Sequence, residues 1–205
     1  PKVRSVAPAP PDLTLPTVFE NLALDEALLV DSDERDGPPR LRFWEQPDFA
    51  VVLGSSRRLA EEVDVDRCRA DGVTIARRTS GGGTVLIGPG ALNVTMVLPM
   101  DYAPELLTVD GAQSYTLERI AAALRLHAPE VRVAGSGDLT MGGRKFSGSA
   151  QRRLRRRVLV HATILYDFPI DRVARYLRVP GRQPAYRGGR THEDFLMNFP
   201  LGREF

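Results

Sequence analysis

The order of strand-like and helix-like segments is the feature of this sequence that most restricts its fold. Helical spacing of apolar residues predicts helices over 21–30, 59–71, 114–128 and 170–177. Short β-branched and aromatic runs predict strands over 41–46, 49–54, 73–78, 84–88 and 91–99, and three candidate strands within 131–168. Because strands and helices do not alternate strictly, we predict an α+β fold with a mainly antiparallel mixed sheet flanked by helices, rather than a doubly wound parallel sheet.

Turn-forming residues separate several of these strands. Pro47-Asp48 joins the first two, and Gly88-Pro89-Gly90 lies between 84–88 and 91–99. Gly142-Gly143 predicts a hairpin turn within 138–153.

Charge and composition restrict the class of protein. The 205 residues include 28 Lys and Arg against 26 Asp and Glu, and the resulting net charge of +2 does not predict nucleic-acid binding. A single cysteine, Cys68, excludes an internal disulfide, and the three histidines are too scattered to predict a structural metal site. No apolar run reaches the roughly 18 residues that a membrane span needs. We expect a cytoplasmic protein with no membrane segment.

The N-terminal segment differs from the rest of the chain. Its prolines oppose helix formation, so we expect residues 1–16 to form a Pro-rich arm. No internal repeat or linker divides the remainder of the chain. We therefore expect residues 17–205 to form a single domain.

A glycine triplet follows a predicted strand and two arginines, in the order Arg77-Arg78-Thr79-Ser80-Gly81-Gly82-Gly83-Thr84. Glycine allows positive φ and close approach of the backbone to a ligand, and successive N–H groups can then converge on an anion. Taken alone, such a triplet is more often a flexible turn than a site. It is not a phosphate-binding P-loop, because no Gly-Lys-Ser/Thr follows.

Lys145 lies between the predicted hairpin turn and a run of small residues. A lysine in this place can present a compact cation to a carboxylate or a phosphate, although an exposed strand lysine is the simpler interpretation. The chain contains only one other lysine, Lys2, and otherwise uses arginine for positive charge. That choice favours a site that requires an ammonium group.

Five arginines precede the last long strand, at positions 152, 153, 155, 156 and 157. A solvated turn is the default interpretation of such a run. The alternative is a basic surface beside Lys145 that contacts an acidic protein or a nucleotide phosphate. Nucleic acid is least favoured because no aromatic residues lie among the arginines.

Taken together, these stretches resemble the lipoate-protein ligase A family, whose fold is shared with biotin protein ligases and octanoyltransferases. The resemblance covers about residues 18–200 and is carried by several motifs in one order. These are NLALDEALL, RRTSGGGTVL, GPGALNVT, GDLTMGGRKFSGSAQ and HATILYDFPIDRVARYL, and the tail QPAYRGGRTHEDFLMNFP is similar to the end of the catalytic domain in one branch.

The resemblance implies a biotin/lipoate protein ligase-like catalytic domain with a six- or seven-stranded sheet and a ligand channel over it. It also implies a reaction in which lipoate or octanoate and ATP, with Mg²⁺, form an acyl-adenylate that acylates a lysine of a lipoyl domain. Lys145 is then the catalytic residue, contacting the carboxylate and the α-phosphate. The residues implied to bind substrate or adenylate are Arg77, Arg78, Ser80, Gly81, Gly82, Gly83, Thr84, Asn93, Asp138, Ser147, Gly148, Ala150 and His161. Of these, His161 is the one whose role we expect to be structural rather than catalytic.

The implied partners are the lipoyl domains of 2-oxoacid dehydrogenase E2 subunits or the glycine cleavage H-type protein. The sequence also departs from the family pattern. Ile87 and Gly88 stand where many ligases have His-Asp, Ala91 replaces Asn, and His161-Ala162 replaces His-Gly. The sequence ends before the accessory domain that many ligases carry, so a separate accessory subunit is a further expected partner.

Two other functions compete with an ATP-dependent ligase. An octanoyl- or lipoyl-transferase would form a thioester on a reactive cysteine and need no ATP, but Cys68 is remote in sequence from the Lys145 motif. A non-catalytic lipoyl- or nucleotide-binding subunit that needs a partner is the second alternative.

Overall fold

A computed structural model of the chain describes residues 13–179, 181 and 183–200, so residues 1–12 of the predicted arm lie outside the described residues. The helices and strands, in chain order, are α1 (Val18–Arg35), β1 (Arg40–Glu45), β2 (Ala50–Leu53), α2 (Leu59–Glu62), α3 (Val65–Ala70), β3 (Thr74–Arg77), β4 (Val85–Ile87), β5 (Ala91–Pro99), η1 (Pro104–Leu107), α4 (Val109–Leu124), β6 (Arg132–Ala134), β7 (Asp138–Met141), β8 (Arg144–Arg153), β9 (Arg157–Leu165), α5 (Asp171–Tyr176), η2 (Ala185–Arg187) and α6 (His192–Phe195).

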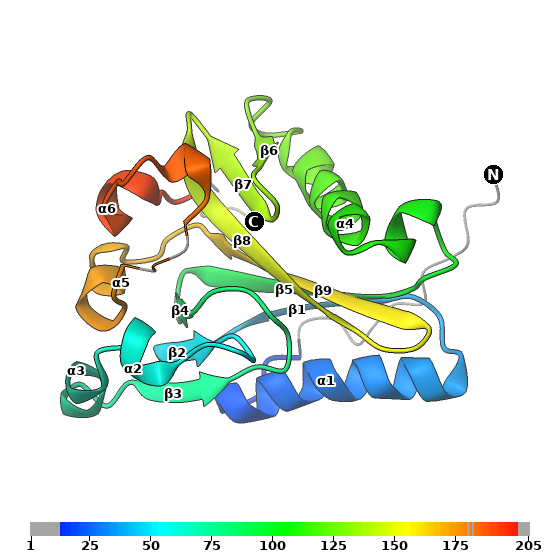
Figure 1. The fold of residues 1–205 in the computed structure, drawn as a ribbon, viewed down its shortest axis with the longest axis horizontal. Coiled ribbons are helices and arrows are strands. Elements are labelled where there is room, and N and C mark those ends of the chain that lie inside the picture. Colours follow the sequence, from blue (N-terminus) through cyan, green and yellow to red (C-terminus); the bar gives the residue numbers. More distant parts are fainter. Residues whose placement is uncertain (1–12, 180, 182, 201–205) are drawn as a thin grey trace.

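A six-stranded sheet in the order β1-β5-β9-β8-β7-β6 forms the centre of the fold, and every neighbouring pair in it is antiparallel. A separate three-stranded sheet has the order β3-β2-β4, with β2 and β3 parallel. Figure 1 shows this small sheet beside one end of the large one. The predicted α+β class with a mainly antiparallel mixed sheet is confirmed.

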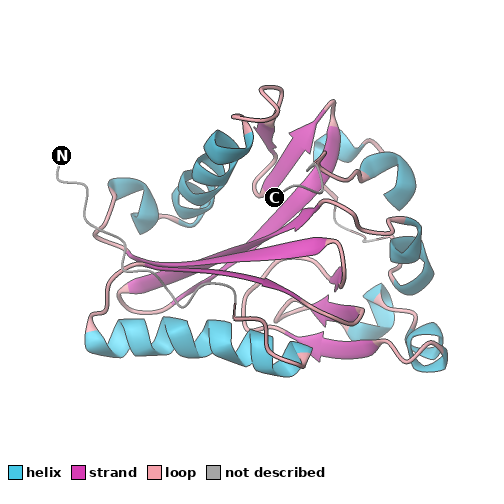
Figure 2. Ribbon diagram, turned by 180° about the vertical axis from the view of Figure 1, so that it is seen from behind, coloured by secondary structure: helices cyan, strands magenta, loops and turns pink. Residues whose placement is uncertain are grey.

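Helices α1 and α4 cover opposite faces of the large sheet (Figure 2). Successive side chains of a strand point to opposite faces of the sheet, so β5 packs against both helices. Val94 packs with Leu117 of α4, whereas Val97 packs with Leu29 of α1. A third apolar cluster joins the small sheet to Val173 and Tyr176 of α5.

Helix α1 is longer than predicted because both of its ends are capped. Thr17 accepts a hydrogen bond from the Glu20 amide while the Glu20 side chain accepts one from the Thr17 amide, which forms a capping box. At the other end Asp36 has φ 52°, a left-handed conformation that stops the helix.

The turn predicted at Pro47-Asp48 joins β1 to β2, and the two strands belong to different sheets. Two details of the predicted order are wrong. The helix predicted over 59–71 is two short helices, because Val63 between them adopts extended backbone and bridges Leu177. The segment 131–168 contains four strands rather than three, and its hairpin turn at Gly142-Gly143 is as predicted, with both glycines at positive φ.

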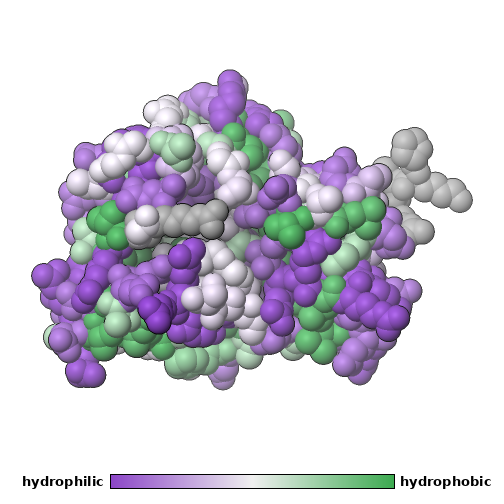
Figure 3. Space-filling model, viewed as in Figure 1, coloured by the Kyte–Doolittle hydropathy of each residue, from purple (hydrophilic) through white to green (hydrophobic). Residues whose placement is uncertain are grey.

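The surface seen in Figure 3 mixes hydrophilic and hydrophobic residues without one broad apolar area. Within the part of the chain that the structure describes, none of the helices has the length and apolar character to cross a membrane.

Candidate active site

A cavity of about 1150 Å³ lies between the two sheets and the C-terminal segment. Most of the predicted site residues line this cavity: Arg78, Gly81, Gly82, Gly83, Thr84, Asn93, Asp138, Lys145, Ser147, Gly148, Ala150 and His161. Arg77 and Ser80 do not line it. The structure therefore brings residues from four distant segments to one hollow.

Lys145 lies at one wall of the cavity, held by a neighbouring carboxylate. Its Nζ is 2.7 Å from Oδ1 of Asp138 on the adjacent strand. The other oxygen of Asp138 accepts a hydrogen bond of 2.6 Å from the hydroxyl of Tyr186. Gly148 makes room for this arrangement, because a Cβ there would lie 2.7 Å from the Lys145 Nζ. The ammonium group is thus positioned rather than free to move in solvent.

Arg78 holds the glycine loop, residues 81–83, from beneath. Its guanidinium is buried and donates to the carbonyl oxygens of Gly81 and Gly83, each at 2.6 Å. Burial, and secondarily the charge of Arg57, lower the pKa of Arg78 to about 10, so it stays protonated at neutral pH. Arg78 therefore shapes the loop through its backbone.

Arg57 holds the third glycine carbonyl of the loop. Its Nε donates to the Gly82 oxygen at 2.9 Å, and its Nη1 forms an ion pair of 3.2 Å with Glu62. Glu62 in turn accepts a hydrogen bond from Thr84 at the end of the loop. In a planar trans peptide the N–H lies opposite the C=O, so the amides of Gly82, Gly83 and Thr84 point away from the arginines that hold the three carbonyls. Successive backbone amides are groups that can bind an anion.

Arg77, the neighbour of Arg78, points away from this loop. Its Nη1 donates to the carbonyls of Gly54, Ser55 and Arg57, at 2.8, 3.2 and 2.7 Å. It holds the turn after β2 and does not reach the cavity wall.

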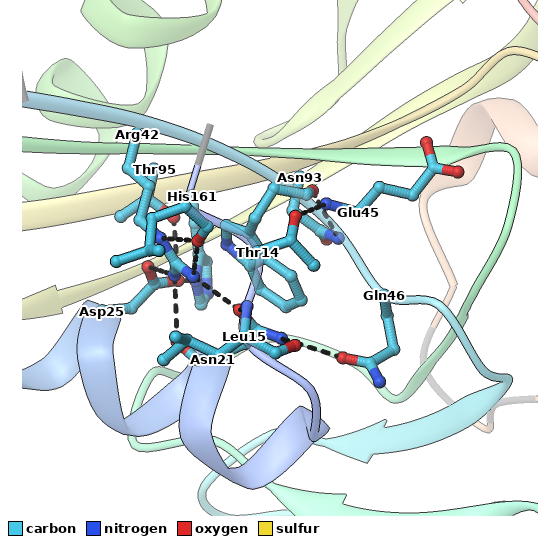
Figure 4. A network of polar contacts seen from close by, with 12 residues as sticks. Thr14, Leu15, Asn21, Asp25, Arg42, Glu45, Gln46, Asn93, Thr95 and His161 are labelled. Atoms are coloured by element: carbon cyan, nitrogen blue, oxygen red, sulfur yellow. Dashed lines mark hydrogen bonds and ion pairs between the residues drawn. The ribbon is translucent and has the colours of Figure 1, made fainter. Parts of the chain in front are cut away.

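His161 belongs to a buried polar network behind the glycine loop (Figure 4). Its Nε2 is 2.7 Å from the hydroxyl of Ser80, and its Nδ1 is 4.0 Å from Asp25 of α1. Asp25 also forms a buried ion pair of 2.6 Å with Arg42. Burial lowers the pKa of His161 and outweighs the opposing effect of Asp25, so the imidazole is neutral at neutral pH. The network ties α1 to the base of the loop through Ser80, which also accepts from Arg78.

Asn93 and Ser147 place two further polar groups at the cavity. Asn93 accepts a hydrogen bond of 2.8 Å from Thr163 and donates to the carbonyls of Trp44 and Ala91. Ser147 is buried, and its hydroxyl has no hydrogen-bond partner among the described residues. A buried hydroxyl without a partner is costly unless a ligand completes it.

The sequence model of the lipoyl protein ligase A/B catalytic domain matches residues 17–194. The chain belongs to this family.

Two relatives show which activities are named among similar chains. A protein of Aeropyrum pernix named as a lipoate-protein ligase A is 36% identical over 168 residues, which are 82% of this chain and 61% of the relative. The octanoyltransferase LipM of Symbiobacterium thermophilum is 29% identical over 191 residues, covering 82% of this chain and 68% of that protein. The chain spans between 46% and 61% of the length of four ligase relatives that it matches.

Two solved structures are similar to this lipoyl ligase family member. The bi-partite lipoate protein ligase of Thermoplasma acidophilum, studied with its E2 lipoyl domain, has a TM-score of 0.76 and 25% identity over 92% of this chain and 72% of that chain. A lipoate-protein ligase A with bound ATP has a TM-score of 0.70 and 24% identity over 98% of this chain and 79% of that chain. The second match establishes similarity of fold.

The C-terminal strap, residues 183–197, forms one wall of the cavity. None of its individual residues was predicted from the sequence as part of the site. Tyr186, Arg187 and His192 of this strap line the cavity. Only the similarity of QPAYRGGRTHEDFLMNFP to one branch of the family pointed to this segment. Its side chains follow no helical or strand periodicity, so no spacing rule could single out the residues of the strap that line the cavity.

The positions that depart from the family pattern are packed into the protein. Ile87 and Ala91 are buried, and Ile87 also lines the cavity. Gly88 is buried against the ring of Phe49, where a Cβ would lie 2.5 Å from a ring carbon. No polar side chain replaces the His-Asp pair at these two positions.

The five arginines at 152–157 lie at the far end of β8, about 25 Å along the strand from Lys145, but Arg153 still lines the cavity. Arg157 is buried, and it donates to Ser32 and to the carbonyl of Gly37. The side chain of Arg156 donates to the carbonyl of Asp33 and that of Arg153 to the carbonyl of Leu106, so these side chains attach the hairpin to its neighbours. A basic surface beside Lys145 that contacts a partner stays a prediction.

We expect Arg157→Gln to lower the free energy of unfolding by about 1 to 3 kcal/mol, because Ser32 and Gly37 would lose their buried charged donor. The matched variant Arg155→Gln changes an exposed arginine of the same turn and is expected to leave the melting temperature unchanged. Thermal unfolding of the two variants compares them directly. Equal melting temperatures would show that Arg157 is dispensable for the fold.

Proposed function

We propose that this protein is an ATP-dependent lipoate-protein ligase, which activates lipoate or octanoate as acyl-AMP and transfers the acyl group to a lysine of a lipoyl domain. The observation that carries the proposal is the position of Lys145, held by Asp138 at a cavity that the glycine loop also lines. The family and the ligase names of several relatives support it.

The first half-reaction brings two anions together. A carboxylate oxygen of the acid attacks the α-phosphorus of ATP, the bond from that phosphorus to the bridging oxygen breaks, and pyrophosphate leaves. The Lys145 ammonium would reduce the repulsion between the anions and stabilise the charge that develops at phosphorus. Amides of the glycine loop would contact the adenylate, and Mg²⁺ would accompany the outer phosphates of ATP. Among the described residues, no group of three or more His, Cys, Asp or Glu could hold a metal ion.

The second half-reaction transfers the acyl group. The neutral ε-amine of the acceptor lysine attacks the acyl carbon, AMP leaves with the bonding electron pair, and the amine loses a proton. The Thermoplasma acidophilum relative is described together with an E2 lipoyl domain, and it is bi-partite. We propose the same class of acceptor here, with the H-type protein as an alternative acceptor, and a separate subunit as a partner for activation.

Mass spectrometry after incubation with lipoate, ATP and Mg²⁺ tests the proposal. Lipoyl-AMP and pyrophosphate are the expected products. If neither forms, alone or with the accessory subunit of a bi-partite relative, the protein is not an ATP-dependent ligase, and the transferase and the binding subunit are the functions left.

The cysteine-dependent transferase is the second candidate, favoured by the LipM relative. Cys68, the sole cysteine of the sequence, is fully buried in the cluster beneath the small sheet and does not line the cavity. Burial raises the pKa of its thiol, which opposes formation of the nucleophilic thiolate. The ligase is therefore the better supported function.

We expect Cys68→Ala to retain acyl transfer at close to the wild-type rate, because the thiol reaches no substrate. The measurement is transfer of the acyl group to a lipoyl domain, with a melting curve to account for loss of packing at a buried position. An acyl thioester on Cys68 in the wild-type protein, and loss of transfer in a folded variant, would instead support the transferase.

A further inference from the structure

An exposed apolar pair, Leu107 and Val109, lies at the mouth of the cavity where η1 meets α4. Leu107 is 64% exposed and Val109 is 54% exposed, and Val109 also lines the cavity. Figure 3 shows hydrophobic surface over η1 and the start of α4. Isolated exposed apolar residues are normal on folded proteins, whereas apolar residues that gather beside a binding cavity indicate an interaction surface.

The backbone between the two residues turns their side chains the same way. Thr108 is extended, with φ −111° and ψ 160°, and the side chains on either side of an extended residue point to one face. The Thr108 hydroxyl is used inside the first turn of α4, where it accepts a hydrogen bond of 3.0 Å from the Gly111 amide. Leu107 and Val109 therefore share one outward surface.

Two side chains of β8 hold this segment in place. Arg153 donates to the carbonyls of Leu106 and Thr108, at 2.8 and 3.1 Å. Gln151 donates to the carbonyl of Val109 at 2.7 Å. Because the backbone is already fixed, a partner that docks on it loses little free energy in ordering it. The apolar pair is thus presented by the fold rather than exposed on a loose loop.

The same glutamine connects the apolar pair with the glycine loop. The carbonyl of Gln151 accepts a hydrogen bond from the Gly81 amide, while its side chain bonds the carbonyl of Val109. The Lys145 ammonium lies beside Gly148, which is three residues from Gln151, or about 10 Å along β8. A partner seated on the apolar pair can therefore insert a long side chain into the cavity toward the Lys145 ammonium.

The charge next to the apolar pair is negative. Asp110 follows Val109 in the first turn of α4, is exposed, and lines the cavity. The other carboxylates that line the cavity, Glu62 and Asp138, each form an ion pair. The Asp110 carboxylate has no ion-pair or hydrogen-bond partner among the described residues. An unpaired carboxylate at a cavity mouth attracts a cation, which favours a partner that presents the ammonium of a lysine.

We propose that Leu107, Val109 and Asp110 form the docking surface for the protein whose lysine receives the acyl group. The proposal rests on the proposed function, because it assigns this surface to the acceptor of the second half-reaction. The acceptor lysine would pass Asp110 as an ammonium on its way into the cavity, and apolar residues beside that lysine would cover Leu107 and Val109. The lysine loses its proton before its amine attacks the acyl carbon, so Asp110 steers the approach and takes no part in the transfer.

Transfer of the acyl group to two kinds of acceptor tests the surface. One is the protein that the wild type acylates, either an E2 lipoyl domain or the H-type protein. The other is hydroxylamine, a small nucleophile that reacts with acyl-AMP without docking. We expect the double variant Leu107→Ser, Val109→Ser to lower kcat/KM for the protein about tenfold or more relative to the rate with hydroxylamine, since burial of such a side chain contributes about this much to affinity.

The matched control is Leu126→Ser, which changes a leucine that is 82% exposed just beyond the other end of α4 and outside the cavity. Thermal unfolding checks that both variants fold. An equal ratio of the two transfer rates in the double variant and in the control would overturn the proposal.

Asp110→Asn gives a second readout. We expect it to raise KM for the protein acceptor at low salt and to make KM less dependent on salt, because surface charges act on association and are screened by ions. An acid in the first turn also stabilises a helix. A lower melting temperature with an unchanged salt dependence of KM would contradict the assignment of Asp110 to the docking surface.

Direct binding separates this surface from the proposed function. Calorimetry of the E2 lipoyl domain with wild type and with the double variant needs no lipoate and no ATP. If no acyl-AMP forms but the domain binds wild type more tightly, the surface stands and the ligase fails. If acyl-AMP forms while both variants treat the protein acceptor as wild type does, the ligase stands and the surface fails. A wild-type dimer in light scattering that the double variant dissociates would assign the apolar pair to a second copy of the chain and overturn the proposal.

Discussion

Lys145→Ala is expected to fold normally and to form acyl-AMP about 100-fold more slowly or worse. Removing a cation aimed at charge that develops in a transition state commonly has an effect of this size. The stability of the fold should change little, because Lys145 is partly exposed and Asp138 keeps its hydrogen bond from Tyr186. Exchange of labelled pyrophosphate into ATP in the presence of lipoate measures the half-reaction, and thermal unfolding checks the fold.

Lys145→Arg is the informative companion, because it retains the charge. The Lys145 ammonium occupies a space that exists because Gly148 has no side chain. A guanidinium is larger and would have to displace neighbouring atoms to fit there. We therefore expect Lys145→Arg to recover only part of the exchange rate. Wild-type exchange by the alanine variant, at equal melting temperature, would remove Lys145 from the mechanism.

Gly82→Ala is the second change with a large expected effect. We expect it to slow adenylate formation about 100-fold, because a displacement of about 1 Å at a reacting group can cause a loss of this size. Gly82 has φ +82°, and a Cβ there would lie 3.0 Å from Nη2 of Arg78 and 3.2 Å from the Cβ of Ala150. The loop would have to move away from the guanidinium that holds its carbonyls.

Gly72→Ala is a matched control for backbone strain. Gly72 has φ +68°, but nothing lies within 4 Å of the position of its Cβ, and it is outside the cavity. Both variants should lose roughly 1 kcal/mol of stability from the left-handed backbone, and only Gly82→Ala should lose adenylation. Equal activity of the two variants would mean that the glycine triplet is an ordinary turn.

Local patterns were sufficient for much of this fold. The β-branched, apolar run in 91–99 predicted β5, and Gly142-Gly143 predicted the hairpin that carries Lys145, because both signals depend on neighbouring residues only. Most of the site residues that the family resemblance implied do line the cavity. Their roles in catalysis stay predictions.

Features that depend on distant partners were out of reach of such patterns. The turn at Pro47 could not reveal that β1 pairs with β5 while β2 pairs with β3 and β4. The break between α2 and α3 depends on the bridge from Val63 to Leu177, more than a hundred residues later. Arg157 reads as part of a charged run, yet its burial is fixed by the far end of α1.

The C-terminal strap is also the last wall of the cavity to be synthesised. Chains leave the ribosome N-terminus first, at about 5 to 20 residues per second, so the glycine loop and the β7–β8 hairpin are made before residues 183–197. Until then the hollow is open on one side, and Arg144 and Asp138 have no strap to bond. Newly made chains therefore contain every strand of the large sheet before the strap can complete the wall of the cavity.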